Sequence, residues 1–269
     1  LRVHRDTGSA IVLDRAVKCG EHLLAQRRVG PQGRRSWIGQ EFGAKAQVAK
    51  DHLGAPGTGA NPPAHGLNGM SHGAAGFAYA LSSLAAASGR DDFVDAASEC
   101  LAFEDSSYDA ARHNWPDLRG GSATAWPCQW CHGAPGIGLA RLGMQKRGGK
   151  ITHREAERLK AAIGNAIAGV EQASPGDVDT LCCGTLGRIE FICEAANALT
   201  RDDLRELAAR RLTSVLQRAA ATGDYRWNAG KRQFNLGLFR GLSGVGYTLL
   251  RQALLLGGDT SLPEILIWE

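Results

Sequence analysis

The stretch "HGAPGIGLARL", residues 132 to 142, opens on a Gly-x-x-Gly pair and continues as an apolar segment with helical spacing. Glycine permits backbone approaches that a Cβ forbids, so such a pair suits a tight entry into a packed helix. Three segments share this design: "HGAAGFAYAL" at 72–81, "CGTLGRIEFI" at 183–192 and "RGLSGVGYTLL" at 240–250. Their first glycines follow one another at intervals of 60, 51 and 57 residues, which leaves room for two helices in each unit. We therefore predict an internal repeat of helix pairs.

The segments between these units are more polar and amphipathic, at about 92–104, 153–173 and 202–221. Thr152 and Glu155 have the spacing of a capping box at the start of the second one. Strand signals are scarce. An apolar helix followed by an amphipathic one, repeated around a ring, predicts an all-α fold, an α/α toroid with inner and outer helices. Residues at the start of every inner helix would then gather at one end of the ring.

Length, charge and hydropathy narrow the class of protein. The chain has 269 residues and is long enough to bury a core without crosslinks. Its 31 basic and 27 acidic residues are spread along the sequence, for a net charge of +4, so no basic stripe indicates a nucleic-acid partner. No apolar run approaches the roughly 18 residues that a membrane span needs. We expect a protein with neither a nucleic-acid partner nor a membrane span.

The cysteines indicate a reducing compartment. There are seven, an odd and unevenly spaced set, and no secretory signal precedes them. This pattern favours free thiols and a cytoplasmic location. Cys19, Cys100 and Cys193 stand among apolar helical residues, and we expect them to be core thiols.

The remaining four cysteines lie in two stretches that the toroid would bring together, "WPCQWCHGAPGIG" at 126–138 and "TLCCGTLGRIEF" at 180–191. Thiols are soft metal ligands. Cys128 and Cys131 also have C-x-x-C spacing and, with Cys182 and Cys183, would suffice for a closed structural Cys₄ zinc site. From the residues alone both an open and a closed metal site are possible.

Four motifs in order, "GMSHGAAGFAYAL", "WCHGAPGIGLARL", "LCCGTLG" and "GLFRGLSGVGYTLLR", resemble the lanthionine synthetase C-like family. "NWPDLR" at 114–119 and the Cys-Cys-Gly form are most similar to the C-terminal cyclase domain of class II lanthipeptide synthetases. The resemblance covers nearly the whole chain, 1–269, as one cyclase domain. It implies an α/α barrel, in agreement with the repeat.

The resemblance implies a zinc ion held by Cys131, Cys182 and Cys183. Three protein ligands leave the fourth tetrahedral position open, as in catalytic zinc sites. The implied reaction is a Michael-type addition of a peptide cysteine to a dehydroalanine or dehydrobutyrine of the same peptide, which forms a (methyl)lanthionine ring. A metal-bound thiol is deprotonated, and the thiolate is the nucleophile.

Two histidines are implicated as well. The resemblance assigns His72, in the first His-Gly-x-x-Gly motif, to proton transfer, and an unperturbed imidazole pKa of about 6.5 suits that role. His65, in "AHGLNG", is the alternative proton-transfer residue if this segment, rather than the one at His72, corresponds to the family's motif. His132, next to Cys131, is expected to hydrogen-bond a metal thiolate or the developing enolate.

The chain departs from the family pattern in two places. Family members use an aspartate in the first glycine-rich motif of the toroid, a motif expected before Leu1, so we expect an N-terminally incomplete ring that lacks its first inner helix. Some members carry an arginine shortly before the zinc cysteine, where this chain has Trp126 to Gln129.

The implied partners are a dehydrated precursor peptide and an N-terminal dehydratase domain of the same polypeptide. Two other functions remain open from the sequence. One is that of a relative that adds glutathione to dehydroamino acids, and the other is that of a zinc-stabilised peptide-binding module without turnover.

Overall fold

The computed structural model describes residues 1–29, 35–36, 66–71, 73–119, 124–148, 152–227 and 235–268. Nine helices lie within these ranges: α1 (Arg2–Thr7), α2 (Ala10–Ala25), α4 (Ala74–Ser88), α5 (Asp91–Asp105), α6 (Ala134–Arg147), α7 (His153–Gln172), α8 (Thr185–Leu199), α9 (Asp202–Thr222) and α10 (Leu242–Leu256). Two strands of two residues each, β1 (Arg28–Val29) and β2 (Arg35–Ser36), pair antiparallel. The predicted all-α class is confirmed, and the short hairpin is an unpredicted addition.

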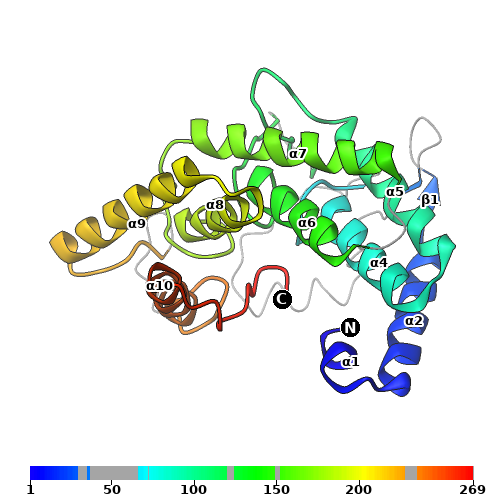
Figure 1. Cartoon of the computed structure of the whole chain (residues 1–269). Helices are drawn as coiled ribbons and strands as arrows, with labels where there is room; N and C mark the ends of the chain where they lie inside the picture. Colours follow the sequence, from blue (N-terminus) through cyan, green and yellow to red (C-terminus); the bar gives the residue numbers. More distant parts are fainter. Residues whose placement is uncertain are drawn as a thin grey trace, which may run out of the picture.

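The helices alternate between an inner and an outer layer of a ring. α4, α6, α8 and α10 each begin one residue after the first glycine of a repeat. The outer helices α5, α7 and α9 each pack mainly against the inner helix that precedes them, and the inner helices pack against one another in chain order. Figure 1 shows the row of helices curving so that α1 and α10 lie at its two ends, with the C-terminal segment between them. This arrangement confirms the predicted α/α toroid.

The Gly-x-x-Gly pairs are explained by a close approach of the main chain to the first turn of each inner helix. A Cβ added at Gly136 would lie 1.8 Å from the carbonyl oxygen of Trp130, and one at Gly187 would lie 2.0 Å from that of Leu181. The second glycines of the other two repeats meet carbonyls at the same offset, Gly76 that of Met70 and Gly244 that of Leu238. Each repeat therefore uses its second glycine to let the entering loop cross the helix.

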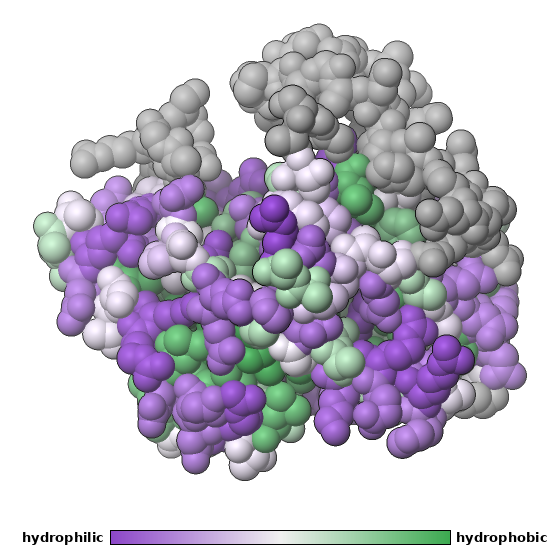
Figure 2. Space-filling view, turned by 90° about the horizontal axis from the view of Figure 1, so that it is seen from above, coloured by the Kyte–Doolittle hydropathy of each residue, from purple (hydrophilic) through white to green (hydrophobic). Residues whose placement is uncertain are grey.

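Burial separates the two layers. α6 is buried from Ala134 to Met144. α7 begins at the predicted capping box, in which Thr152 and Glu155 bond each other's main-chain N–H groups. α9 carries exposed ion pairs such as that of Arg210 with Glu206. The face seen from above in Figure 2 is accordingly mostly hydrophilic, with hydrophobic side chains visible in a hollow.

A buried ion pair joins the layers to the loop that leads into α4. Arg141 of α6 donates to Glu104 of α5 at 2.6 Å, and both side chains are at most 1% exposed. The other carboxylate oxygen of Glu104 accepts the N–H of Gly69 at 2.9 Å. Burial raises the pKa of Glu104, while the Arg141 guanidinium opposes that rise. The pair therefore fixes where the chain enters the first glycine-led repeat.

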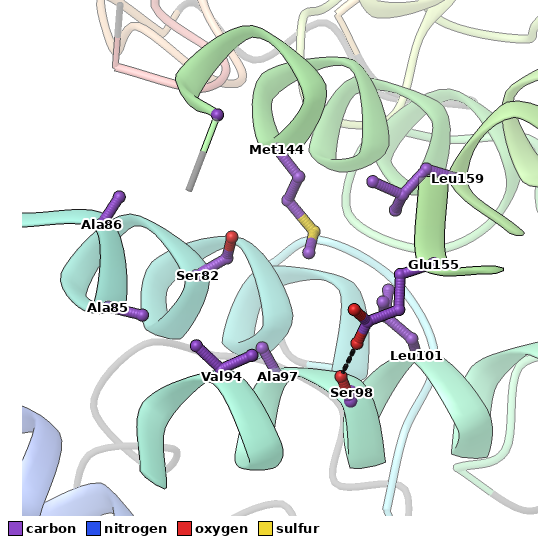
Figure 3. A pocket seen from close by; sticks show the side chains of 11 residues that line it. Ser82, Ala85, Ala86, Val94, Ala97, Ser98, Leu101, Met144, Glu155 and Leu159 are labelled. Atoms are coloured by element: carbon purple, nitrogen blue, oxygen red, sulfur yellow. Dashed lines mark hydrogen bonds between the residues drawn. The ribbon is translucent and has the colours of Figure 1, made fainter. Parts of the chain in front are cut away.

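A small cavity lies between the inner and outer layers at α4 to α7 (Figure 3). Its volume is about 30 Å³, and apolar side chains such as Met144 and Leu159 line it. Ser98 donates to Glu155 at its edge. The space suits a water molecule rather than a peptide, so it is a packing feature of the two layers. None of the described helices is both long and apolar enough to cross a membrane.

The expectation of three core thiols is wrong for Cys19. Cys100 and Cys193 are buried, whereas Cys19 is exposed on α2. Its neighbour Gly20 lies against α4 and α5, where a Cβ would clash with Leu84 and Phe93. Successive residues are about 100° apart around a helix, so burial of Gly20 turns Cys19 toward solvent.

Candidate metal centre

Three cysteines from two repeats meet at one end of the ring. Cys131 stands two residues before Gly133, the N-cap of α6, and Cys182 and Cys183 stand directly before Gly184, the N-cap of α8. Their sulfurs all lie within 4.8 Å of one another. The Sγ atoms of Cys131 and Cys183 are 3.7 Å apart, and those of Cys182 and Cys183 are 3.4 Å apart. The two cysteine stretches therefore meet, as the toroid predicted.

A ladder of main-chain hydrogen bonds holds these loops side by side. Ser71 donates its N–H to the carbonyl of Cys131 at 3.3 Å, Cys131 donates to Cys182 at 3.4 Å, and Cys182 donates to Phe239 at 2.9 Å. Each of these four residues stands two positions before the first glycine of its repeat. The repeat register alone thus brings equivalent positions of four loops together at the end of the ring.

The three thiols fit a zinc ion. Two sulfurs bound at about 2.3 Å and at a tetrahedral angle lie about 3.8 Å apart, close to the observed 3.7 Å between Cys131 and Cys183. Thiolate donors also suit zinc better than they suit hard cations such as magnesium. Cys131, Cys182 and Cys183 are the residues that would hold the ion.

The thiols of the cluster differ in the direction in which their pKa values are shifted. Hydrogen bonding to Cys131 and Cys182 lowers the pKa of the Cys183 thiol, and the guanidinium of Arg240 lowers it further. The pKa of the Cys131 thiol shifts in the opposite direction. Hydrogen bonds to the sulfur of Cys182 and, next in size, to that of Cys183 raise it. Arg240 Nη2 lies 3.7 Å from the sulfur of Cys183. The Arg240 guanidinium therefore favours the thiolate form of Cys183.

Cys128 is not a member of the three-sulfur group. Its carbonyl accepts from Arg188 at 2.7 Å, and its thiol lies in the field of Arg188 and Arg211 rather than of Arg240. Burial raises the pKa of this thiol. Among the residues that the structure describes, the cysteines therefore form a three-sulfur group, and the geometry favours the open alternative over the closed Cys₄ site.

Of the three histidines named from the sequence, the structure describes one, His132. His132 is buried, and its Nδ1 contacts the carbonyl of Asn68 at 3.3 Å; it is not part of the metal-ligating group. His72 and the alternative His65 lie outside the described residues. Ser71, which precedes His72 in the chain, donates its N–H to the carbonyl of Cys131.

Two features of this end of the ring were not predicted. Arg240 contacts the cluster from the fourth repeat, and Phe239 stacks on Trp130 with ring centroids 5.1 Å apart. The signal for Arg240 was available: it directly precedes the first glycine of its repeat, the register that places His132 and Cys183 in theirs. For the stacked pair no signal was present, because the contact joins positions 130 and 239.

Fold and thiol cluster together define an α/α toroid with a three-cysteine centre at the N-terminal ends of its inner helices. The family model "Lanthionine synthetase C-like protein" matches residues 5–264. The chain therefore belongs to the lanthionine synthetase C-like family.

Among solved structures, the chain is similar to one titled "Nisin cyclase", with a TM-score of 0.53 and 16% sequence identity. The match covers 75% of this chain and 50% of that one, so this chain spans about half the length of that protein. At this identity the likeness shows the shared toroid fold. No curated protein sequence matches the chain significantly.

Proposed function

We propose that residues 1–269 form a zinc-dependent peptide cyclase domain of the kind found in class II lanthipeptide synthetases. The reaction is the addition of peptide cysteine thiols to dehydroalanine or dehydrobutyrine, which closes lanthionine or methyllanthionine rings. The observation that carries the proposal is the cluster of Cys131, Cys182 and Cys183 at the inner-helix ends. Family membership and the toroid fold support it.

Zinc held by Cys131, Cys182 and Cys183 would supply a Lewis acid that keeps an incoming thiol deprotonated at neutral pH. The chain would contribute three sulfurs, one fewer than a tetrahedral ion accepts, and would so leave a position for the peptide. The ladder of main-chain bonds from Ser71 to Phe239 holds the backbones of Cys131 and Cys182 side by side.

The proton needed at the acceptor's α-carbon is assigned to a histidine. Attack of sulfur on the β-carbon moves the double-bond electrons onto the acceptor's carbonyl oxygen, and the α-carbon then takes up a proton. His72 is proposed to deliver it, since the loop that ends at Ser71 contacts Cys131. His132 is proposed to support the loop architecture and the developing charge, because it is buried, follows Cys131 in the chain and contacts the carbonyl of Asn68.

The proposed substrate is a dehydrated precursor peptide. A dehydratase domain earlier in the same polypeptide is proposed to supply it, in the cytoplasm, where free thiols persist. Glutathione addition and peptide binding without turnover are the two competing functions, and they make different predictions for one assay.

The test uses a peptide that already contains one dehydroalanine and one cysteine, assayed with and without added glutathione. The zinc-loaded chain should consume the free thiol much faster than the spontaneous reaction does, with no change in peptide mass. Cys182→Ala should abolish this acceleration, and Cys128→Ala should retain it. Addition of glutathione to the peptide in place of ring closure would support the first competitor, and peptide binding with no loss of thiol the second; either would contradict the proposal.

A further inference from the structure

We propose that Arg240 is the anion-binding residue of this site and that it holds the acceptor's carbonyl oxygen as that oxygen gains negative charge. The inference rests on the proposed function. It adds a side chain from the fourth repeat, whose Phe239 carbonyl already accepts the N–H of Cys182, to the proposed site.

The repeat places Arg240 at the cluster. It stands directly before Gly241, the N-cap of α10, just as Cys183 stands before Gly184 and His132 before Gly133. The preceding residue, Phe239, accepts the N–H of Cys182 at 2.9 Å. The main chain of Arg240 is thus fixed against that of a proposed ligand, while its side chain remains exposed.

The guanidinium is also available. Arg240 Nη2 lies 3.7 Å from the sulfur of Cys183, and no carboxylate pairs with Arg240 anywhere in the described ranges. Arg119, whose charge also acts on Cys131 and Cys183, is instead held by Asp117 at 2.9 Å. Among the residues that the structure describes, Arg240 is therefore the cation at the cluster that no carboxylate neutralises.

The chemistry requires such a cation. Three thiolates on a divalent ion carry a net charge of −1, and an enolate formed beside them would add another negative charge. When sulfur bonds to the β-carbon, the π electron pair of the Cα=Cβ bond ends on the carbonyl oxygen, and Arg240 donates N–H groups to that oxygen. Arg240 keeps its own protons, because a guanidinium does not titrate in this pH range. A separate acid then protonates the α-carbon.

A first test needs neither metal nor turnover. In the metal-free protein, Cys183 is alkylated with anionic iodoacetate or with neutral iodoacetamide, and the rates are read by peptide mass mapping. Changes in thiol ionisation act equally on both rates, so their ratio reports the local charge. Coulomb's law in water at about 5 Å predicts that Arg240→Ala lowers the ratio about fourfold at low salt.

Arg240→Lys should keep most of the ratio, and Arg210→Ala, which removes an exposed arginine of α9, should leave it unchanged. Circular dichroism checks that the variants fold. An unaltered ratio in folded Arg240→Ala would overturn the assignment.

A second test uses ring closure. Arg240→Ala should keep its zinc and lose about 10²-fold in kcat, as expected for removal of one donor to a developing oxyanion. Millimolar guanidinium should restore part of the loss in Arg240→Ala and none of it in a variant damaged elsewhere, such as Cys182→Ala. Normal ring closure by Arg240→Ala would overturn this inference and leave the proposed function standing. A lowered alkylation ratio in a chain that closes no rings would support the anion site and contradict the cyclase.

Discussion

The main-chain N–H of Cys131 donates to the carbonyl of Cys182 at 3.4 Å, although 51 residues separate them in the chain. The bond joins two loops that each lead into an inner helix, and it uses no side-chain atom. The sulfurs of Cys131, Cys182 and Cys183 are therefore brought together by the repeat itself. A metal would bind to a centre that is already assembled, which lowers the conformational cost of binding.

Metal content should depend on three of the seven cysteines. Replacement of Cys131, Cys182 or Cys183 by alanine should each reduce bound zinc to well below one equivalent, because two thiols make a poor zinc site. Cys128→Ala should retain a full equivalent, since that thiol lies outside the cluster. Elemental analysis after dialysis against a weak chelator measures this. Zinc loss in Cys128→Ala at the level of Cys131→Ala would favour the closed site.

The second glycine of each repeat should tolerate no side chain. Gly136→Ala places a Cβ 1.8 Å from the Trp130 carbonyl and should lower the free energy of unfolding by about 1–3 kcal/mol or more. Gly164 offers the matched control, because it is exposed within α7 and a Cβ there meets nothing within 4 Å. Gly164→Ala should raise stability by about 0.5–1 kcal/mol. Urea denaturation of both variants checks this, and equal effects would refute the close-approach account of the motif.

Removal of only one partner of the Glu104–Arg141 ion pair should strongly destabilise the fold. Glu104→Ala leaves the buried Arg141 guanidinium with only a long, 4.0 Å contact to Asp105 and should destabilise the fold by about 3–5 kcal/mol. The double variant Glu104→Leu, Arg141→Met should recover much of that loss, since two apolar groups leave no charge buried. If the double variant were less stable than Glu104→Ala alone, the pair would have another role.

Replacement of His72 should slow ring closure without releasing zinc. His72→Asn should retain zinc yet close rings about 10²–10⁴-fold more slowly, the usual contribution of a positioned general acid or base. His65→Asn is the control, and it should leave the rate unchanged. A slow His65→Asn with a normal His72→Asn would assign the proton transfer to the other register of the motif.

Much of the toroid could be predicted because its determinants are local. Gly73, Gly133, Gly184 and Gly241 mark where the inner helices begin, and a closed ring of such helices implies that the residues before them converge. The convergence of Cys131 with Cys183 followed from that argument, whereas the choice of three ligands came from the family resemblance.

The rest depended on information that is not local. The exposure of Cys19 follows from which face of α2 packs on α4, and the apolar residues beside it gave no unique answer. The hairpin of β1 and β2 is too short for an alternating pattern. A lone arginine such as Arg240 has no chemical signature of its own, and its importance emerges only when its register in the repeat is read together with its contact to Cys183.

The most direct measurement is X-ray absorption at the zinc edge. It is made first on the chain alone and then with a cysteine-containing peptide whose acceptor residue is unreactive, so that the thiol binds but no ring closes. The account predicts three sulfurs at about 2.3 Å and one lighter ligand in the free protein, and four sulfurs once the peptide is bound. Four sulfurs in the free protein, reduced to three by Cys128→Ala, would contradict it.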